Sequence, residues 1–286
     1  MTPNAPEGPQ RTPKDPTSWL NLPTPPGQLP GKAAGIDPGP TSTILQKHHF
    51  LIRRLHSLSG IVPVGLFVIM HLFTNFQLVA GDFQHEVNFI HSLPALLVVE
   101  VGLWIGIGFH AGLGLVYTFT SSPNVQHYPY ADNWRYTLQR ITGVVALIFI
   151  FMHIATLRWH WTFGGLFTTF YVSTKDGYPL AAASTARALE SDWIMAAYAI
   201  GVLSVVFHWC NGLWTAAITW GLTLSATAMR RWGIVCSALG IALTLFSAGA
   251  LVGARSYAPH PDDSAMMQQA DVEGGGHRGE KVGVME

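Results

Sequence analysis

Four histidines of this chain lie deep inside apolar stretches, where an ionisable side chain is costly. They are His71, His110, His153 and His208, one in each of four stretches. Measured along helices from the ends that we expect to face the outside, His71 and His153 lie about 10 Å deep and the other two about 23 Å deep. The histidines therefore sort into two pairs at two depths, and each pair draws on two different helices.

Two imidazoles that face each other at one depth can act as axial ligands of a haem iron. A neutral imidazole offers a nitrogen lone pair to the metal, and the surrounding helices form a dry cavity for the porphyrin. Glycines are frequent in these stretches and leave room for a flat ring, although they serve close helix packing equally well. The alternative for any one buried histidine is a hydrogen-bonded packing role. A di-iron oxygenase would need clustered HxxxH spacings near the cytoplasmic face, which the sequence lacks.

The cysteines point to no metal or redox chemistry. Cys210 and Cys236 both lie in apolar stretches, where a thiol usually packs as a small hydrophobic group. They form neither a CxxC pair nor a zinc spacing, and no CxxCH occurs. A covalently attached c-type haem is therefore excluded.

The composition predicts an all-α membrane protein. Of the 286 residues, 49% are hydrophobic and 11% are charged, whereas soluble domains carry roughly 25% charged residues. The 16 basic and 16 acidic residues cancel, so no basic field exists to hold nucleic acid. Apolar stretches of about 20 residues cross a bilayer as helices. We expect five transmembrane helices in a bundle that binds two b haems, over residues 55–78, 94–120, 138–159, 193–222 and 234–253.

The segments outside the bundle are polar. Residues 1–46 form a proline-rich extension that we expect to be disordered and that has no signal-peptide core, residues 47–256 form the membrane domain, and residues 257–286 form a polar tail. Positive charges near helix ends predict a cytoplasmic amino terminus and an external carboxyl terminus. Four positive charges flank the far side of the membrane domain, whereas seven flank the side of the amino terminus. These seven are Lys47, Arg53, Arg54, Arg135, Arg140, Arg230 and Arg231.

Four stretches of the sequence resemble one known family. They are RRLHSLSGIVPVGLFVIMHL (53–72), the tripeptide FHA (109–111), NWRYTLQRITGVVALIFIFMHI (133–154) and GVLSVVFHWCNGLWTAAITWG (201–221). The chain is similar here to the cytochrome b subunit of succinate dehydrogenase, in its Bacillus-type cytochrome b558 branch. The similarity covers about residues 53–251 and leaves out the proline-rich extension and the tail.

The resemblance implies a dihaem membrane anchor of succinate:menaquinone oxidoreductase (complex II) in the bacterial cytoplasmic membrane. By this resemblance His71 and His153 ligate the outer (distal) haem b, and His110 and His208 ligate the inner (proximal) one. A flavoprotein and an iron–sulfur subunit bind on the cytoplasmic face, and electrons reach quinone through the two haems. The family also implies menaquinone as the acceptor, with its site near the outer haem.

Two further groups of residues are candidates around these cofactors. Glu100 is the only carboxylate well inside an expected helix, near the depth of the outer pair, and it either passes protons near the quinone or packs as a neutral, hydrogen-bonded acid. Haem propionates need donors or cations near the membrane face. On the inner side the candidates are Arg54, His56, Ser57, Ser59, Trp134 and Arg140, although the arginines equally fit lipid headgroup contacts.

Other functions remain open at this level. The same kind of anchor serves a quinol:fumarate reductase, and the chain alone does not give the direction of electron flow. Dihaem anchors of formate dehydrogenases and hydrogenases arrange their histidines differently. A proton-coupled transporter could use buried histidines and Glu100, but transporters usually show internal repeats or interrupted helices, and no repeat is visible here.

Overall fold

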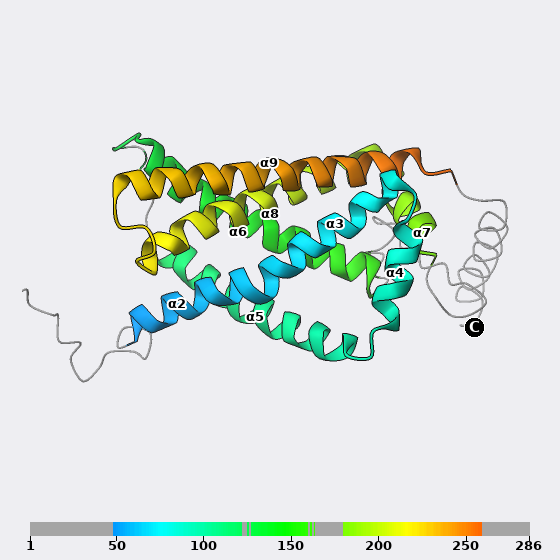
Figure 1. Cartoon of the computed structure of the whole chain (residues 1–286), viewed down its shortest axis with the longest axis horizontal. Coiled ribbons are helices and arrows are strands. Elements are labelled where there is room, and N and C mark those ends of the chain that lie inside the picture. Colours follow the sequence, from blue (N-terminus) through cyan, green and yellow to red (C-terminus); the bar gives the residue numbers. More distant parts are fainter. Residues whose placement is uncertain are drawn as a thin grey trace, which may run out of the picture. The chain divides into compact units, whose positions relative to one another are not determined.

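The computed structural model describes residues 48–121, 125, 127–159, 161, 163 and 180–258. Every regular element in these residues is a helix, which confirms the all-α fold class (Figure 1). In chain order the elements are α2 (His49–Ser59), η2 (Gly60–Gly65), α3 (Leu66–Ala80), α4 (Phe83–Ser92), α5 (Leu96–Thr120), α6 (Ala131–Leu157), α7 (Ala181–Ala188), α8 (Asp192–Thr219) and α9 (Ala226–Ser256). The predicted extension over 1–46 and the tail beyond Ala258 lie outside the described residues.

The five predicted membrane spans are present. In the part of the chain that the structure describes, five helical segments are long and apolar enough to cross a bilayer: the continuous helix from α2 to α3, α5, α6, α8 and α9. Large apolar side chains point outward along these spans, among them Leu97 at 71% exposure and Ile105 at 68%. Such apolar surface on helices of this length fits contact with lipid, because helices satisfy their backbone hydrogen bonds internally and need no water. The chain is therefore a multi-pass membrane protein.

The first, third and fifth spans begin well before the apolar cores that the sequence marks, whereas the second begins two residues later than predicted and the fourth ends three residues earlier. The third span begins at Ala131 rather than at residue 138, and the fifth begins at Ala226 rather than at 234. Helical hydrogen bonding continues through the polar residues there, and the Ser225 hydroxyl caps α9 by accepting the Ala228 N–H at 3.1 Å. Two short helices, α4 and α7, were not predicted.

The first span contains a widened turn. Residues Gly60–Gly65 form a π-helical segment, η2, between α2 and α3, with Pro63 inside it. Proline lacks an N–H and its ring clashes with the carbonyl one turn earlier in an α-helix, so a wider turn accommodates it. The Leu66 N–H then bonds the carbonyls of Pro63 and Val62, which carries the helix onward without a break.

Helix α8 holds the bundle together. It packs against both α6 and α9, while α3 packs against α9 and α5 lies chiefly against η2 (Figure 1). The core cluster joins Leu72, Val206, Cys210 and Leu243 from α3, α8 and α9. Both cysteines are free and buried, as a packing role requires. At one end of the bundle α7 packs against α4 and α9, and the Ala181 N–H donates to Gln84 Oε1 at 2.9 Å.

The close contact between α3 and α9 depends on a glycine. A Cβ on Gly253 would lie 2.7 Å from the carbonyl carbon of Leu78, whereas a Cβ on Gly102 of α5 would meet nothing within 4 Å. We expect Gly253→Ala to destabilise the protein by about 1–3 kcal/mol through overpacking. Gly102→Ala is the matched control and leaves stability unchanged or slightly raised, since alanine favours helix. Thermal unfolding in detergent measures both, and equal midpoints would contradict the close contact.

Candidate functional site

The structure brings the four deep histidines together in two facing pairs. The imidazoles of His110 on α5 and His208 on α8 have ring centres 6.0 Å apart and planes at 85°. Those of His71 on α3 and His153 on α6 lie 5.7 Å apart with planes at 79°. These are the groupings that depth along the helices predicts, and each pair joins two different helices.

His110 is seated on the backbone of the first span. Its Nδ1 lies 2.9 Å from the carbonyl oxygen of His56, and a Cβ on Gly60 would come within 3.0 Å of its ring atoms. We call this arrangement the His56–Gly60 notch. It consists of the His56 carbonyl, which the imidazole contacts, and of Gly60 four residues later, which has no side chain to block the imidazole. A carbonyl only accepts hydrogen bonds, so Nδ1 carries the proton and Nε2 keeps its lone pair.

His208 is seated on α6 in the same way. Its Nδ1 lies 2.9 Å from the carbonyl oxygen of Gln139, and a Cβ on Gly143 would come 2.8 Å from its ring. We call this the Gln139–Gly143 notch. Both inner imidazoles thus have a fixed tautomer and a fixed orientation, with Nε2 free to bind a metal.

A buried polar network fixes the Gln139–Gly143 notch. The Gln139 amide donates to the carbonyl of His208 at 3.0 Å, so the two residues are bonded in both directions. Asn211, which is 5% exposed, donates to Gln139 Oε1 at 2.8 Å and accepts from Arg135 Nε at 2.9 Å. The Arg135 guanidinium also lies over the Trp214 ring, 3.7 Å from its centre. Each member has a partner, as buried polar groups in an apolar setting require.

Three buried nitrogens of histidine and arginine side chains have no hydrogen-bond partner among the described residues, and the one on His56 lies beside the inner pair. His56 stacks on His110 with ring centres 4.2 Å apart, and its Nε2 is buried with no hydrogen-bond partner among the described residues. The same holds for Nε of Arg54 and of Arg140. Arg140 also donates to the carbonyls of Thr118 and Ser121 at the end of α5. Buried donors of this kind suit an anionic group.

The outer pair has different surroundings. His71 stacks against Phe67 one turn earlier, with ring centres 5.2 Å apart. The Nδ1 of His153 lies 3.2 Å from the hydroxyl of Tyr198 on α8, and the Phe149 ring contacts both residues. A side-chain hydroxyl therefore stands where the inner imidazoles have a backbone carbonyl.

Glu100 pairs with an arginine near the ends of α5 and α6. Its Oε1 lies 3.3 Å from Nε of Arg158, with the two side chains 32% and 65% exposed. Next to them Trp104 of α5 stacks on Trp159, with ring centres 5.5 Å apart. Glu100 therefore has an arginine partner at this end of the bundle.

Comparison with known proteins gives the family. The chain is 35% identical over 184 residues to the succinate dehydrogenase cytochrome b558 subunit of Bacillus subtilis (strain 168), which covers 63% of this chain and 85% of that protein. No protein-family model matches the chain. It belongs to the succinate dehydrogenase cytochrome b558 family.

Membership of a cytochrome b family implies haem b, and the inner pair fits such a group. Metal–imidazole bonds are about 2 Å long, so two imidazoles on opposite sides of one ion have ring centres about 6 Å apart. Both pairs have that separation. Among the described residues no group of three or more His, Cys, Asp or Glu could hold a metal ion. Two ligands suffice for haem, since the porphyrin supplies the other nitrogens.

Ser57 and Trp134, which were also predicted to contact haem propionates, have different surroundings. The Ser57 hydroxyl donates to the carbonyls of Arg53 and Arg54 and accepts from Trp220 Nε1 at 3.0 Å, so it links α2 to the end of α8. Trp134 is 49% exposed and shares the outward face of α6 with Leu138 and Ile141. The structure therefore does not bring Trp134 into the buried cluster.

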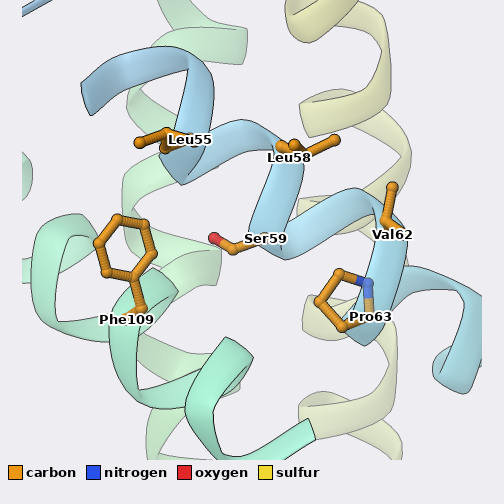
Figure 2. A pocket seen from close by; sticks show the side chains of 6 residues that line it. All are labelled: Leu55, Leu58, Ser59, Val62, Pro63 and Phe109. Atoms are coloured by element: carbon orange, nitrogen blue, oxygen red, sulfur yellow. The ribbon is translucent and has the colours of Figure 1, made fainter. Parts of the chain in front are cut away.

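An apolar groove lies beside the inner pair in this family member. Leu55, Leu58, Ser59, Val62 and Pro63 line it from the first span and Phe109 from α5, around about 360 Å³ (Figure 2). The one polar side chain in this lining is Ser59, whose hydroxyl donates to the His56 carbonyl at 2.9 Å. The groove therefore offers apolar contact and no converging polar groups, unlike a typical substrate site.

The sequence does not reveal the residues that orient these histidines. Gln139, Asn211 and Tyr198 received no role, although an uncharged polar side chain within a span is itself a signal, because it must find a partner in lipid. Arg135 was assigned only to membrane topology. The partners of these polar residues depend on which faces of two helices meet. The sequence periodicity does not give the rotation of one helix relative to another.

The network at the Gln139–Gly143 notch predicts a stability effect. Asn211→Ala leaves Gln139 Oε1 and Arg135 Nε buried without these partners, and we expect a loss of about 1–3 kcal/mol. Asn88→Ala on α4 is the control, because its side chain is exposed and accepts one bond from Gln84; surface changes of this kind stay within about 0.5 kcal/mol. Thermal unfolding in detergent compares the two, and equal losses would count against the network.

Proposed function

We propose that this chain is the membrane anchor and dihaem cytochrome b subunit of a succinate:menaquinone oxidoreductase. Two facing histidine pairs inside a five-span member of the cytochrome b558 family carry this proposal. The relative it matches is named for succinate dehydrogenase, which is the activity that the proposal transfers to the complex containing this chain.

In this proposal the two pairs hold two b haems. His110 and His208 would hold the iron of the inner haem, and His71 and His153 would hold that of the outer haem. When bound, the haems supply one-electron carriers between an iron–sulfur subunit and quinone. The chain's own residues fix the inner imidazoles through the His56–Gly60 and Gln139–Gly143 notches. The unpartnered nitrogens of Arg54 and His56 are the donors for propionates, with Ser57 holding the end of α2 beside them.

The partners and the orientation follow from the family and the charges. A flavoprotein and an iron–sulfur subunit bind on the cytoplasmic side, where the amino terminus lies, and the carboxyl terminus is outside. Exposed Arg53, Arg230 and Arg231 near the same end of the bundle support this assignment. Electrons then enter near His110 and His208 and leave near the outer pair.

Glu100 handles protons at the quinone in this proposal. Reduction of a quinone takes up two electrons and two protons, so its site needs a group that passes protons. Glu100 holds a carboxylate at the outer end of α5, in contact with Arg158, and aromatic rings of Trp104 and Trp159 stack beside it. A carboxylate, a cation and aromatic faces are the groups that a flat quinone headgroup would contact.

Counting haem in histidine variants tests the ligand assignment. We expect two b haems per chain in the purified protein and one in each variant in which His71, His110, His153 or His208 is replaced by alanine. His71→Ala and His153→Ala should remove the same haem, distinguished by its potential, because they supply the same iron. His91→Ala, an exposed residue on α4, is the control and keeps both haems. A colourless wild-type protein would overturn the proposal and favour the transporter.

The role of Glu100 has its own test. Glu100→Gln keeps the shape of the side chain but carries no transferable proton, so we expect quinone-linked succinate oxidation to fall by about tenfold or more. Haem spectra should stay intact. Arg158→Gln is the companion variant, which removes the ion pair while leaving the carboxylate, and it should retain more activity than Glu100→Gln. Unchanged turnover in Glu100→Gln would remove the proton-transfer role.

A further inference from the structure

We propose that Tyr198 is the positioning residue for His153 and that its hydroxyl tunes the outer haem alone. The inference rests on the proposed function, since it takes His153 as an iron ligand. Tyr198 lies on α8, ten residues before His208, and its hydroxyl oxygen is 3.2 Å from Nδ1 of His153 on α6. Helix α8 would then carry His208, a ligand of the inner haem, and Tyr198, which positions a ligand of the outer haem.

Two ring contacts hold the Tyr198 hydroxyl at this place. The rings of Tyr198 and His153 meet at 68° with centres 5.7 Å apart. Phe149, one turn before His153 on α6, packs edge-on against Tyr198 at 5.2 Å. A Cβ on Gly201 would collide with the Phe149 ring, so the glycine on α8 lets this ring enter the contact. The hydroxyl is therefore aimed at His153 by packing from both helices.

The direction of the hydrogen bond follows from metal binding. An imidazole whose Nε2 binds iron carries its proton on Nδ1, so His153 donates and the Tyr198 oxygen accepts. An acceptor on Nδ1–H raises the basicity of the imidazole and fixes its ring orientation. Greater basicity favours the oxidised metal, so removing the acceptor should make the outer haem easier to reduce.

The inner pair lacks such an adjustable partner. Backbone carbonyls of His56 and Gln139 accept from His110 and His208, and no side-chain substitution deletes a carbonyl. For His153 the partner is a side chain, so Tyr198→Phe removes this hydrogen bond, together with the one between Tyr198 and Thr156, and leaves the ring packing. Selectivity for one haem therefore separates this role from a general structural one.

Tyr198→Phe in the purified full-length protein tests the proposal. We expect two b haems, with the midpoint potential of one shifted to a more positive value and the other unchanged. The shifted haem should be the one that His153→Ala removes. Its ferric EPR signal, which depends on the angle between the two imidazole planes, should change as well. Tyr130→Phe, the same chemical change at an exposed position, is the control and moves neither potential.

The outcomes separate the inference from the proposed function. Two haems with both potentials unchanged in Tyr198→Phe would overturn the role of Tyr198 and leave the anchor function standing. An equal shift of both haems would also overturn it, because the effect would then be structural. Loss of the outer haem alone supports the positioning role, whereas loss of the inner haem contradicts it. A wild-type protein without two b haems defeats the proposed function itself.

Discussion

The inner histidine pair depends on one interaction, the hydrogen bond from an imidazole to a backbone carbonyl of a neighbouring helix. A helical carbonyl that accepts a hydrogen bond within its helix can accept others from side chains that reach it, and the His56 carbonyl accepts both from Ser59 of its own span and from His110 of α5. Glycine four residues later makes that approach possible at both His56 and Gln139. Because a backbone carbonyl cannot rotate away, the imidazole keeps one tautomer and one direction without help from a flexible partner.

The same constraint shapes the helices around it. In lipid each polar side chain within a span must find a protein partner, so Gln139, Asn211 and Arg135 form one closed network. This network ties α6 to α8 at the level of His208, and Tyr198 ties the same two helices at the level of His153. Helix α8 thereby serves both histidine pairs while its other side packs on α9.

The sequence predicts what depends on residue type and on distance along a helix. Length and apolarity give the five spans, and the depth of the four histidines gives their grouping. The ends of the helices were harder to predict, because polar residues such as Asp132 and Asn133 belong to α6 although they carry no apolar signal. Helix α4 is too short and mixed to be read as a span, although Phe83, Val87 and Ile90 follow a helical spacing. A contact such as that between Tyr198 and His153 depends on how two helices are rotated about their axes. No single stretch of sequence determines that relative rotation.

The wide turn in the first span has a consequence for sequence comparison. In an uninterrupted α-helix the 15 residues from His56 to His71 would separate their directions by about 60° beyond four full turns. The π-helical residues 60–65 rotate less per residue, which changes the direction in which His71 points relative to His56. A relative whose first helix is regular would therefore align with this chain only if one position is skipped near Pro63, and an ungapped alignment would equate residues that point in different directions.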